Sequence, residues 1–104
     1  MRLAILSSAE REAFESAIWL EQRQPGLGDS FLGELARCFD RIATRPESHS
    51  RYEPYRGTDT IRRCKVRPFS YLVIYRQREE ELLVIAICHG RRMPLYWLQR
   101  LSTG

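Results

Sequence analysis

The sequence lacks several features that would place it in a common functional class. No apolar run approaches the roughly 18 residues of a membrane-spanning helix, and the glycines are too scattered to form a phosphate-binding loop. The three widely spaced cysteines (Cys38, Cys64 and Cys88) fit neither a disulfide framework nor a paired-cysteine metal site, and the two histidines, His49 and His89, lie far apart. We therefore expect buried reduced thiols, no metal, no cofactor and no membrane contact.

The N-terminal residues MRLAILSSAERE pass from a short apolar patch directly into acidic, helix-forming sequence, without a signal-like apolar region and cleavage site. We expect a cytoplasmic protein. A chain of 104 residues buries roughly two-thirds of its unfolded surface, so the sequence predicts one domain over residues 1–104.

Lysine is almost absent, because 16 of the 17 basic residues are arginine. Residues 1–50 carry 6 arginines and 8 acidic side chains, a net charge of −2, whereas residues 51–104 carry 11 basic and 5 acidic side chains, a net charge of +6. Arginine binds phosphates and carboxylates in bidentate geometry. The second half therefore predicts a surface for an anionic partner, either nucleic acid or an acidic protein segment; a GC-rich genome is the alternative explanation for any single arginine.

Hydrophobic periodicity predicts a short strand followed by two helices. Residues 2–6 are strand-like, and Ser7 with Glu10 forms a capping-box pattern at the start of the first helix, which ends near PGLG at 25–28. Apolar residues spaced by three and four then extend a second helix as far as Pro46: Phe31, Leu32, Leu35, Phe39, Ile42 and Ala43. The short turn between the two helices predicts an antiparallel hairpin.

The second half of the chain predicts strands. Residues 46–59 have no periodicity and are interpreted as a loop or a ragged edge strand, and RQREEE at 76–81 as a charged turn. In IRRCKVR at 61–67 the cations alternate onto one face, whereas SYLVIYR and LLVIAIC are apolar throughout and are expected to be covered on both faces. Pro94 would begin a short terminal helix. The predicted fold class is α+β: an N-terminal strand and a helical hairpin packed on a curved, mainly antiparallel sheet, with a short C-terminal helix.

Few residues are placed to carry chemistry. Cys88 and His89 are adjacent on a strand, so they point to opposite faces and cannot form a catalytic pair. What remains is a basic constellation that antiparallel pairing would gather on one exposed face of the sheet: Arg63, Lys65, Arg67, His89, Arg91, Arg92 and Tyr96. Such cations bind a phosphodiester, and a tyrosine or histidine moves a proton or stacks on a base. In the alternative interpretation Arg91 and Arg92 pair with acids on the helices and Tyr96 covers the core.

Three segments carry a family resemblance: LGDSFLGELARCFDRIATRPE, then YRG followed by IRRCKVRPFSYLVIYR, and finally LLVIAICHGRRMPLYW. Over nearly the whole chain they are similar to the RelE/ParE superfamily of toxins from type II toxin–antitoxin pairs, in the branch of plasmid stabilisation proteins. Members that resemble RelE are ribosome-dependent mRNA endonucleases, and those that resemble ParE inhibit DNA gyrase.

The resemblance implies where an endonuclease site would fall, namely on Arg63, Lys65, Arg67, Arg92 and Tyr96. RelE-like nucleases also place an arginine directly after the tyrosine of the central strand, where this chain has Leu72. Such a phosphate-stabilising cation is worth about 2–4 kcal/mol in comparable electrostatic roles. The resemblance therefore favours the ParE-like branch and a gyrase inhibitor over an enzyme.

The resemblance also implies a cognate antitoxin that wraps over the helical hairpin and the basic sheet, in a heterotetramer or a larger assembly. The residues expected to contact the antitoxin or the target are Phe14, Ile18, Phe39, Arg62, His89 and Arg91. Two alternatives stay open: a non-toxic binding module of the same fold, and sequence-unspecific nucleic-acid binding through the arginines, with an affinity that falls steeply with salt.

Overall fold

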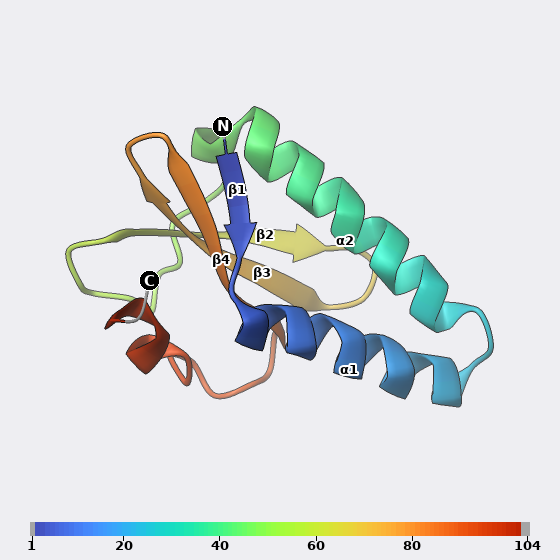
Figure 1. Ribbon diagram of the computed structural model, residues 1–104. Helices are drawn as coiled ribbons and strands as arrows, with labels where there is room; N and C mark the ends of the chain where they lie inside the picture. Colours follow the sequence, from blue (N-terminus) through green and yellow to red (C-terminus); the bar gives the residue numbers. More distant parts are fainter. Residues whose placement is uncertain (1, 103–104) are drawn as a thin grey trace.

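The computed structural model describes residues 2–102, so Met1 and residues 103–104 of the predicted domain lie outside the described residues. Strand β1 (Arg2–Ile5) leads into helices α1 (Ser7–Arg23) and α2 (Leu27–Thr44), and strands β2 (Thr60–Val66), β3 (Tyr71–Arg78) and β4 (Glu81–His89) follow. Two short 3₁₀ helices, η1 (Pro46–Ser48) and η2 (Leu98–Ser102), flank the three later strands. The predicted α+β class and its order of elements are confirmed (Figure 1).

The four strands form one mixed sheet in the order β1-β4-β3-β2. β1 runs parallel to β4, while β2, β3 and β4 pair antiparallel, so β2 is an edge strand and β3 and β4 are central. Between Ile74 and Tyr75 the register of the pair skips Ile85 on β4, a bulge that bends and twists the strand. The apolar strand and its cationic neighbour are thus adjacent, as the sequence predicted.

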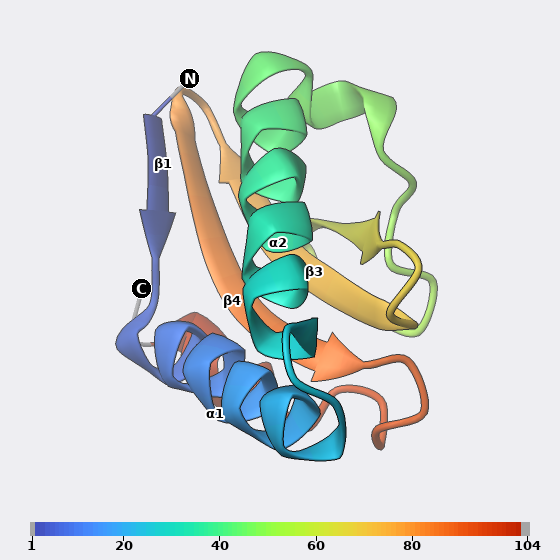
Figure 2. The ribbon, with the colours of Figure 1, turned by 90° about the vertical axis from the view of Figure 1, so that its right-hand side faces the viewer.

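Both faces of the central strands are buried. The helical hairpin covers one face, which Figure 2 shows with α2 lying across the sheet, and its core includes Phe31, Leu35, Val73 and Tyr75. Residues 95–101 and two tyrosines before β2 cover the other face around Ile61, Ile74, Ile85 and Trp97. This two-sided cover explains the continuous apolar runs, because the middle residues of both central strands are buried and exposed side chains occur only at the strand ends.

The turn of the hairpin depends on two glycines and one carboxylate. Gly26 has a φ of 93°, a conformation that favours glycine, and its backbone N–H, like that of Gly28, donates to the side chain of Glu21 at 2.9 Å. A Cβ at Gly28 would lie 2.6 Å from the carbonyl oxygen of Ala17, so the helices approach closely there. The predicted helical hairpin is confirmed, and α1 supplies the side-chain cap for the start of α2.

The predicted capping box is wrong. Leu6 is the N-cap of α1 and no side-chain cap bond forms. The Leu6 N–H donates to the Val84 carbonyl at 3.1 Å, which continues the β1–β4 pairing up to the first helical turn, and the Leu6 carbonyl accepts from Glu10 N–H at 2.9 Å. Strand pairing therefore places the N-cap at Leu6, one residue before Ser7, where α1 begins.

Two other boundaries differ from the prediction. The chain after Pro94 does not enter a helix, because Leu95 has a left-handed φ of 66°, and only the 3₁₀ helix from Leu98 follows. The charged turn is shorter than expected: Arg76 and Arg78 belong to β3, and the turn is confined to Glu79 and Glu80. The segment interpreted as a loop contains η1 and a single bridge from Arg51 to Arg62.

Candidate functional site

Cations of β2 line an open groove at the edge of the sheet, which we call the β2 groove. Its volume is about 560 Å³, and its lining contains Arg63, Lys65 and Arg67 together with Arg41 from α2 and His49 from the following loop. Because β2 is the edge strand, its side chains reach this groove beside α2. The structure therefore gathers the predicted cationic stripe and adds Arg41 and His49 to it.

The stripe continues to the end of the sheet where β4 finishes. Val66 pairs with Tyr71 and Tyr71 with His89, so the last residues of β2 and β4 lie at the same end. A second groove of about 530 Å³ there is lined by Lys65, Arg67 and Gly90, among others. Arg91 is exposed beside it, with its backbone N–H donating to His89 Nδ1 at 3.1 Å. Antiparallel pairing thus brings Lys65 and Arg67 near the end of β4, as the sequence predicted.

Unlike Arg63 and Lys65, Arg62 does not line the β2 groove but forms hydrogen bonds within the protein. Its guanidinium donates to the carbonyl oxygen of His49 at 2.7 Å and to Gln77 Oε1 at 3.4 Å. The His49 ring in turn lies with Nδ1 3.2 Å from the Tyr75 hydroxyl. Arg62 therefore ties the segment after η1 to β2 and shapes one wall of the β2 groove.

Arg92 and Tyr96 face a carboxylate on α1 that sequence analysis missed. The Glu12 carboxylate accepts a hydrogen bond from the Tyr96 hydroxyl. It also accepts two hydrogen bonds from the Arg100 guanidinium, at 2.9 and 3.1 Å, in bidentate geometry. The Arg92 guanidinium lies 3.7 Å from the same carboxylate and 3.7 Å above the Tyr96 ring. The alternative in which Arg92 pairs with an acid on the helices is thus the arrangement found.

This cluster, the Glu12 cluster of Glu12, Arg92, Tyr96 and Arg100, also completes the edge of β4. Beyond its pairing with β1, the Ile87 N–H donates to Glu12 Oε1 at 3.0 Å, and the Ile85 carbonyl accepts from Arg100 at 3.0 Å. Burial, followed by the hydrogen bond to Glu12, raises the pKa of the Tyr96 hydroxyl. A hydroxyl held in this way keeps its proton and supports packing rather than proton transfer.

The signal for Glu12 was present in the sequence. It lies at the edge of the buried stripe of α1 that contains Ala9, Ala13 and Ala17, and an acid that is partly buried beside an apolar stripe needs a polar partner. That partner is Arg100, 88 residues away, and no local pattern connects the two.

The helical hairpin presents exposed apolar side chains. Phe14 and Ile18 on α1 are 54% and 58% exposed, and Trp19, which sequence analysis did not single out, is 51% exposed. Phe14 and Phe39 line one shallow groove of about 160 Å³ between the two helices, with Leu32 and Leu35 at its floor. Phe14 and Phe39, two of the predicted contact residues, therefore share a groove, and Ile18 lies one turn further along α1.

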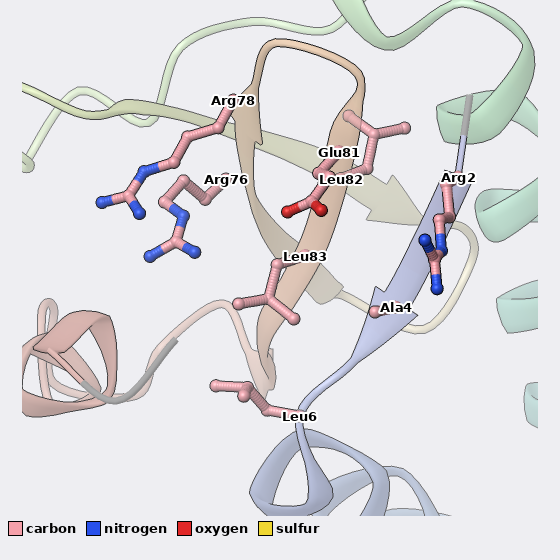
Figure 3. Close-up of a pocket in the computed structure, with 8 residues that line it drawn as sticks. All are labelled: Arg2, Ala4, Leu6, Arg76, Arg78, Glu81, Leu82 and Leu83. Atoms are coloured by element: carbon pink, nitrogen blue, oxygen red, sulfur yellow. The ribbon is translucent and has the colours of Figure 1, made fainter.

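A further pocket of about 250 Å³ lies where β1 and β4 meet the end of β3 (Figure 3). Its charged lining is Arg2, Arg76, Arg78 and Glu81. Arg76 is only 4% exposed and donates to the Leu101 carbonyl at 3.3 Å, while Arg78 pairs with Asp59 at 3.0 Å. These contacts explain why the two arginines lie in a strand rather than in the predicted turn.

Residues 2–102 contain neither a metal-binding cluster nor a membrane-spanning helix. Within that range no group of three or more histidine, cysteine, aspartate or glutamate side chains is placed to hold a metal ion. Over the same range, no helix is long and apolar enough to cross a bilayer.

Comparison with known proteins assigns the family. The model of the family described as ParE toxin of type II toxin–antitoxin system, parDE, matches residues 4–94. A search of curated proteins found no match. The matched residues extend from Ala4, inside β1, to Pro94 and so include the end of β1, the hairpin and strands β2, β3 and β4. The chain belongs to the ParE toxin family, as its resemblance implied, and a member of this family has a cognate antitoxin as its partner.

Proposed function

We propose that this ParE toxin inhibits DNA gyrase without cleaving RNA, and that its antitoxin neutralises it by covering the helical hairpin and the β2 groove. Family membership supports a gyrase target over a ribosomal one. The observation that carries the proposal is the Glu12 cluster, because Tyr96 and Arg92 contact a carboxylate on α1 instead of facing the cations of the β2 groove. An endonuclease would need these groups around one phosphodiester.

Two assays on the purified toxin separate the mechanisms. We expect inhibition of gyrase supercoiling and no cleavage of ribosome-bound mRNA. Arg92→Ala is then expected to leave mRNA intact, as the native protein does. Cleavage by the native toxin that Arg92→Ala abolishes would establish the RelE-like endonuclease with the site Arg63, Lys65, Arg67, Arg92 and Tyr96.

Antitoxin docking on the hairpin is supported by the exposed apolar side chains of α1. Charged replacements there, Phe14→Glu and Ile18→Glu, should weaken binding of the neighbouring-gene antitoxin about 30-fold or more, because buried apolar anchors dominate interface energies. Met93→Glu is the matched control, since Met93 is also apolar and exposed but lies after β4. Equal affinities for the three variants would place the antitoxin elsewhere.

The cationic lining of the β2 groove supports a second contact with the antitoxin, in which Arg63, Lys65 and Arg67 bind acidic residues of the antitoxin tail. The proposed complex is a heterotetramer or a larger assembly. The cations of the β2 groove also favour a second candidate, direct binding of nucleic acid. A dissociation constant for duplex DNA or RNA that rises steeply with salt supports the second candidate, and an affinity that is flat with salt excludes it. Full antitoxin binding without growth inhibition would instead identify a non-toxic binding module.

A further inference from the structure

Two of the three buried cysteines lie against each other where α2 packs on β2. Cys38 of α2 and Cys64 of β2 have sulfur atoms 3.3 Å apart, and both are free thiols. Cys88 belongs to the core on the opposite face of the sheet. A pair of thiols in contact differs chemically from an isolated buried cysteine, because one sulfur is already beside the atom with which it can bond.

The two sulfurs of the pair have different neighbours and opposite shifts in pKa. The Arg41 guanidinium lies 3.3 Å from Cys38 Sγ and 3.9 Å from Cys64 Sγ, and the Lys65 carbonyl lies 3.2 Å from Cys38 Sγ. The hydrogen bond between the two sulfurs, with the charges of His49 and Arg41, lowers the pKa of Cys64 in spite of its burial. The same contact and burial raise the pKa of Cys38. The surroundings therefore favour the thiolate at Cys64 and the protonated thiol at Cys38.

Cys64 is the sulfur of the pair that lies nearer to solvent. Cys64 is 3% exposed and lines the β2 groove, whereas Cys38 is 0% exposed and does not line it. The charged side chains around the groove are mostly cationic: Glu34, Arg41, His49, Arg63, Lys65 and Arg67. A cysteine in the wall of an electropositive groove has the charge environment of a reactive cysteine.

We propose that Cys64 and Cys38 form a peroxide-reactive site, in which a hydroperoxide oxidises Cys64 and Cys38 then closes a disulfide between β2 and α2. In the first step the Cys64 thiolate attacks the terminal peroxide oxygen, the O–O bond breaks, and Cys64 becomes a sulfenic acid as the hydroperoxide is reduced to an alcohol or water. In the second step Cys38 sulfur displaces the sulfenic hydroxyl, which leaves as water with the Cys38 proton.

The geometry suits the second step. The two sulfurs need to approach from 3.3 Å to about 2.05 Å, a short movement for side chains on two elements that are already packed. The bond would join residues 26 positions apart and so close the loop that contains η1 and His49. Oxidation would thus fix α2 to the edge strand and set the shape of the β2 groove. The site does not depend on the gyrase target or on the docking surface proposed above.

The test treats the reduced full-length protein with hydrogen peroxide, blocks remaining thiols with an alkylating reagent and measures intact mass. We expect two of the three thiols to be lost, with a mass decrease of about 2 Da before alkylation is counted. Trypsin should release one linked peptide, residues 38–41 joined to residues 64–65, from a product that stays monomeric without reductant.

Variants distinguish the two steps. Cys38→Ser should stop at a sulfenic acid on Cys64, a gain of about 16 Da that a sulfenic-acid trap captures. Cys64→Ser should leave Cys38 reduced, and Cys88→Ser, the control, should form the same linked peptide as the native protein. Consumption of Cys88 as fast as Cys64, or persistence of three thiols in the native protein under peroxide, would overturn the proposal without needing any variant to fold.

Discussion

Glu12 shows how much one side chain can hold together in a small fold. Its carboxylate receives hydrogen bonds from the backbone of β4, from Tyr96 and from Arg100, and its side chain is only 11% exposed. Each donor would otherwise be left buried without this partner, which is costly for a charged guanidinium and for a strand N–H alike.

Removing this carboxylate should therefore destabilise the protein strongly. Glu12→Ala is expected to lower the free energy of unfolding by about 3 kcal/mol, since it breaks a buried charged network. Glu15→Ala, at an exposed position of the same helix, should change it by no more than about 0.5 kcal/mol. Urea unfolding measures both, and equal midpoints for the two variants would contradict the assignment.

The lowered pKa of Cys64 predicts how the ionisation of this thiol depends on pH. Because the folded protein favours the thiolate at Cys64, the ultraviolet absorbance of a thiolate should appear at a pH below the ordinary cysteine pKa of about 8.5 and be missing from Cys64→Ser. Arg41→Gln should move the midpoint upward, since it removes one of the positive charges that stabilise the thiolate, whereas Arg37→Gln on the exposed side of α2 should not. Identical titrations of the native protein and Cys64→Ser would show that Cys64 stays protonated.

At the level of whole elements, local patterns found the helices and strands but not all of their ends. The 3.6-residue periodicity and the stop at Pro46 predicted α2, and the apolar runs predicted β3 and β4. The start of α1 and the shape of the C-terminal segment were missed because distant contacts decide them. The start of α1 depends on the backbone hydrogen bond from Leu6 to Val84, which is distant in sequence. Leu95 adopts its left-handed conformation where it packs on the core around Ile74 and Ile85, and no local pattern near Leu95 predicts that contact.

The hairpin gives two glycine substitutions of opposite sign. Gly28→Ala should lower the free energy of unfolding by about 1–3 kcal/mol, because the new Cβ would meet the Ala17 carbonyl at 2.6 Å. Gly33→Ala, inside the same helix with 3.7 Å of clearance, should raise it by about 0.5–1 kcal/mol through helix propensity. Chemical denaturation of both variants checks the pair; stabilisation by both would mean that the helices do not approach at Gly28.

At the level of the whole molecule, the sheet is a shared layer between two cores. Sequence analysis predicted the core under the helices, and it predicted two-sided cover for β3 and β4 without identifying what covers the second face. The cover is the segment around Trp97, which contacts Tyr52 and Tyr55 from before β2. The candidate site shows the same limit: the cations of β2 were predictable from strand alternation, whereas the groove wall from Arg41 and His49 depends on tertiary packing.

The core around Trp97, on the face of the sheet away from the helices, should contribute as much to the free energy of unfolding as the core under the helices. Trp97→Ala is expected to cost about 3–5 kcal/mol, because Trp97 is 1% exposed and fills the space above Ile74 and Ile85. Trp19→Ala, at a tryptophan that is 51% exposed and stacks with Arg23, should cost no more than about 1 kcal/mol. Unfolding monitored by circular dichroism compares the two, and a small loss for Trp97→Ala would mean that the C-terminal segment is not part of the folded unit.

The parallel pairing of β1 with β4 has a consequence for how the chain is made. Arg2 pairs with Glu81, so the first strand and both helices leave the ribosome long before the strand against which they pack. Synthesis proceeds from the N-terminus, and contacts between distant residues form slowly. The nascent toxin therefore stays incomplete until β4 has been translated, and a chain that terminates before β4 cannot assemble the surface by which the toxin acts.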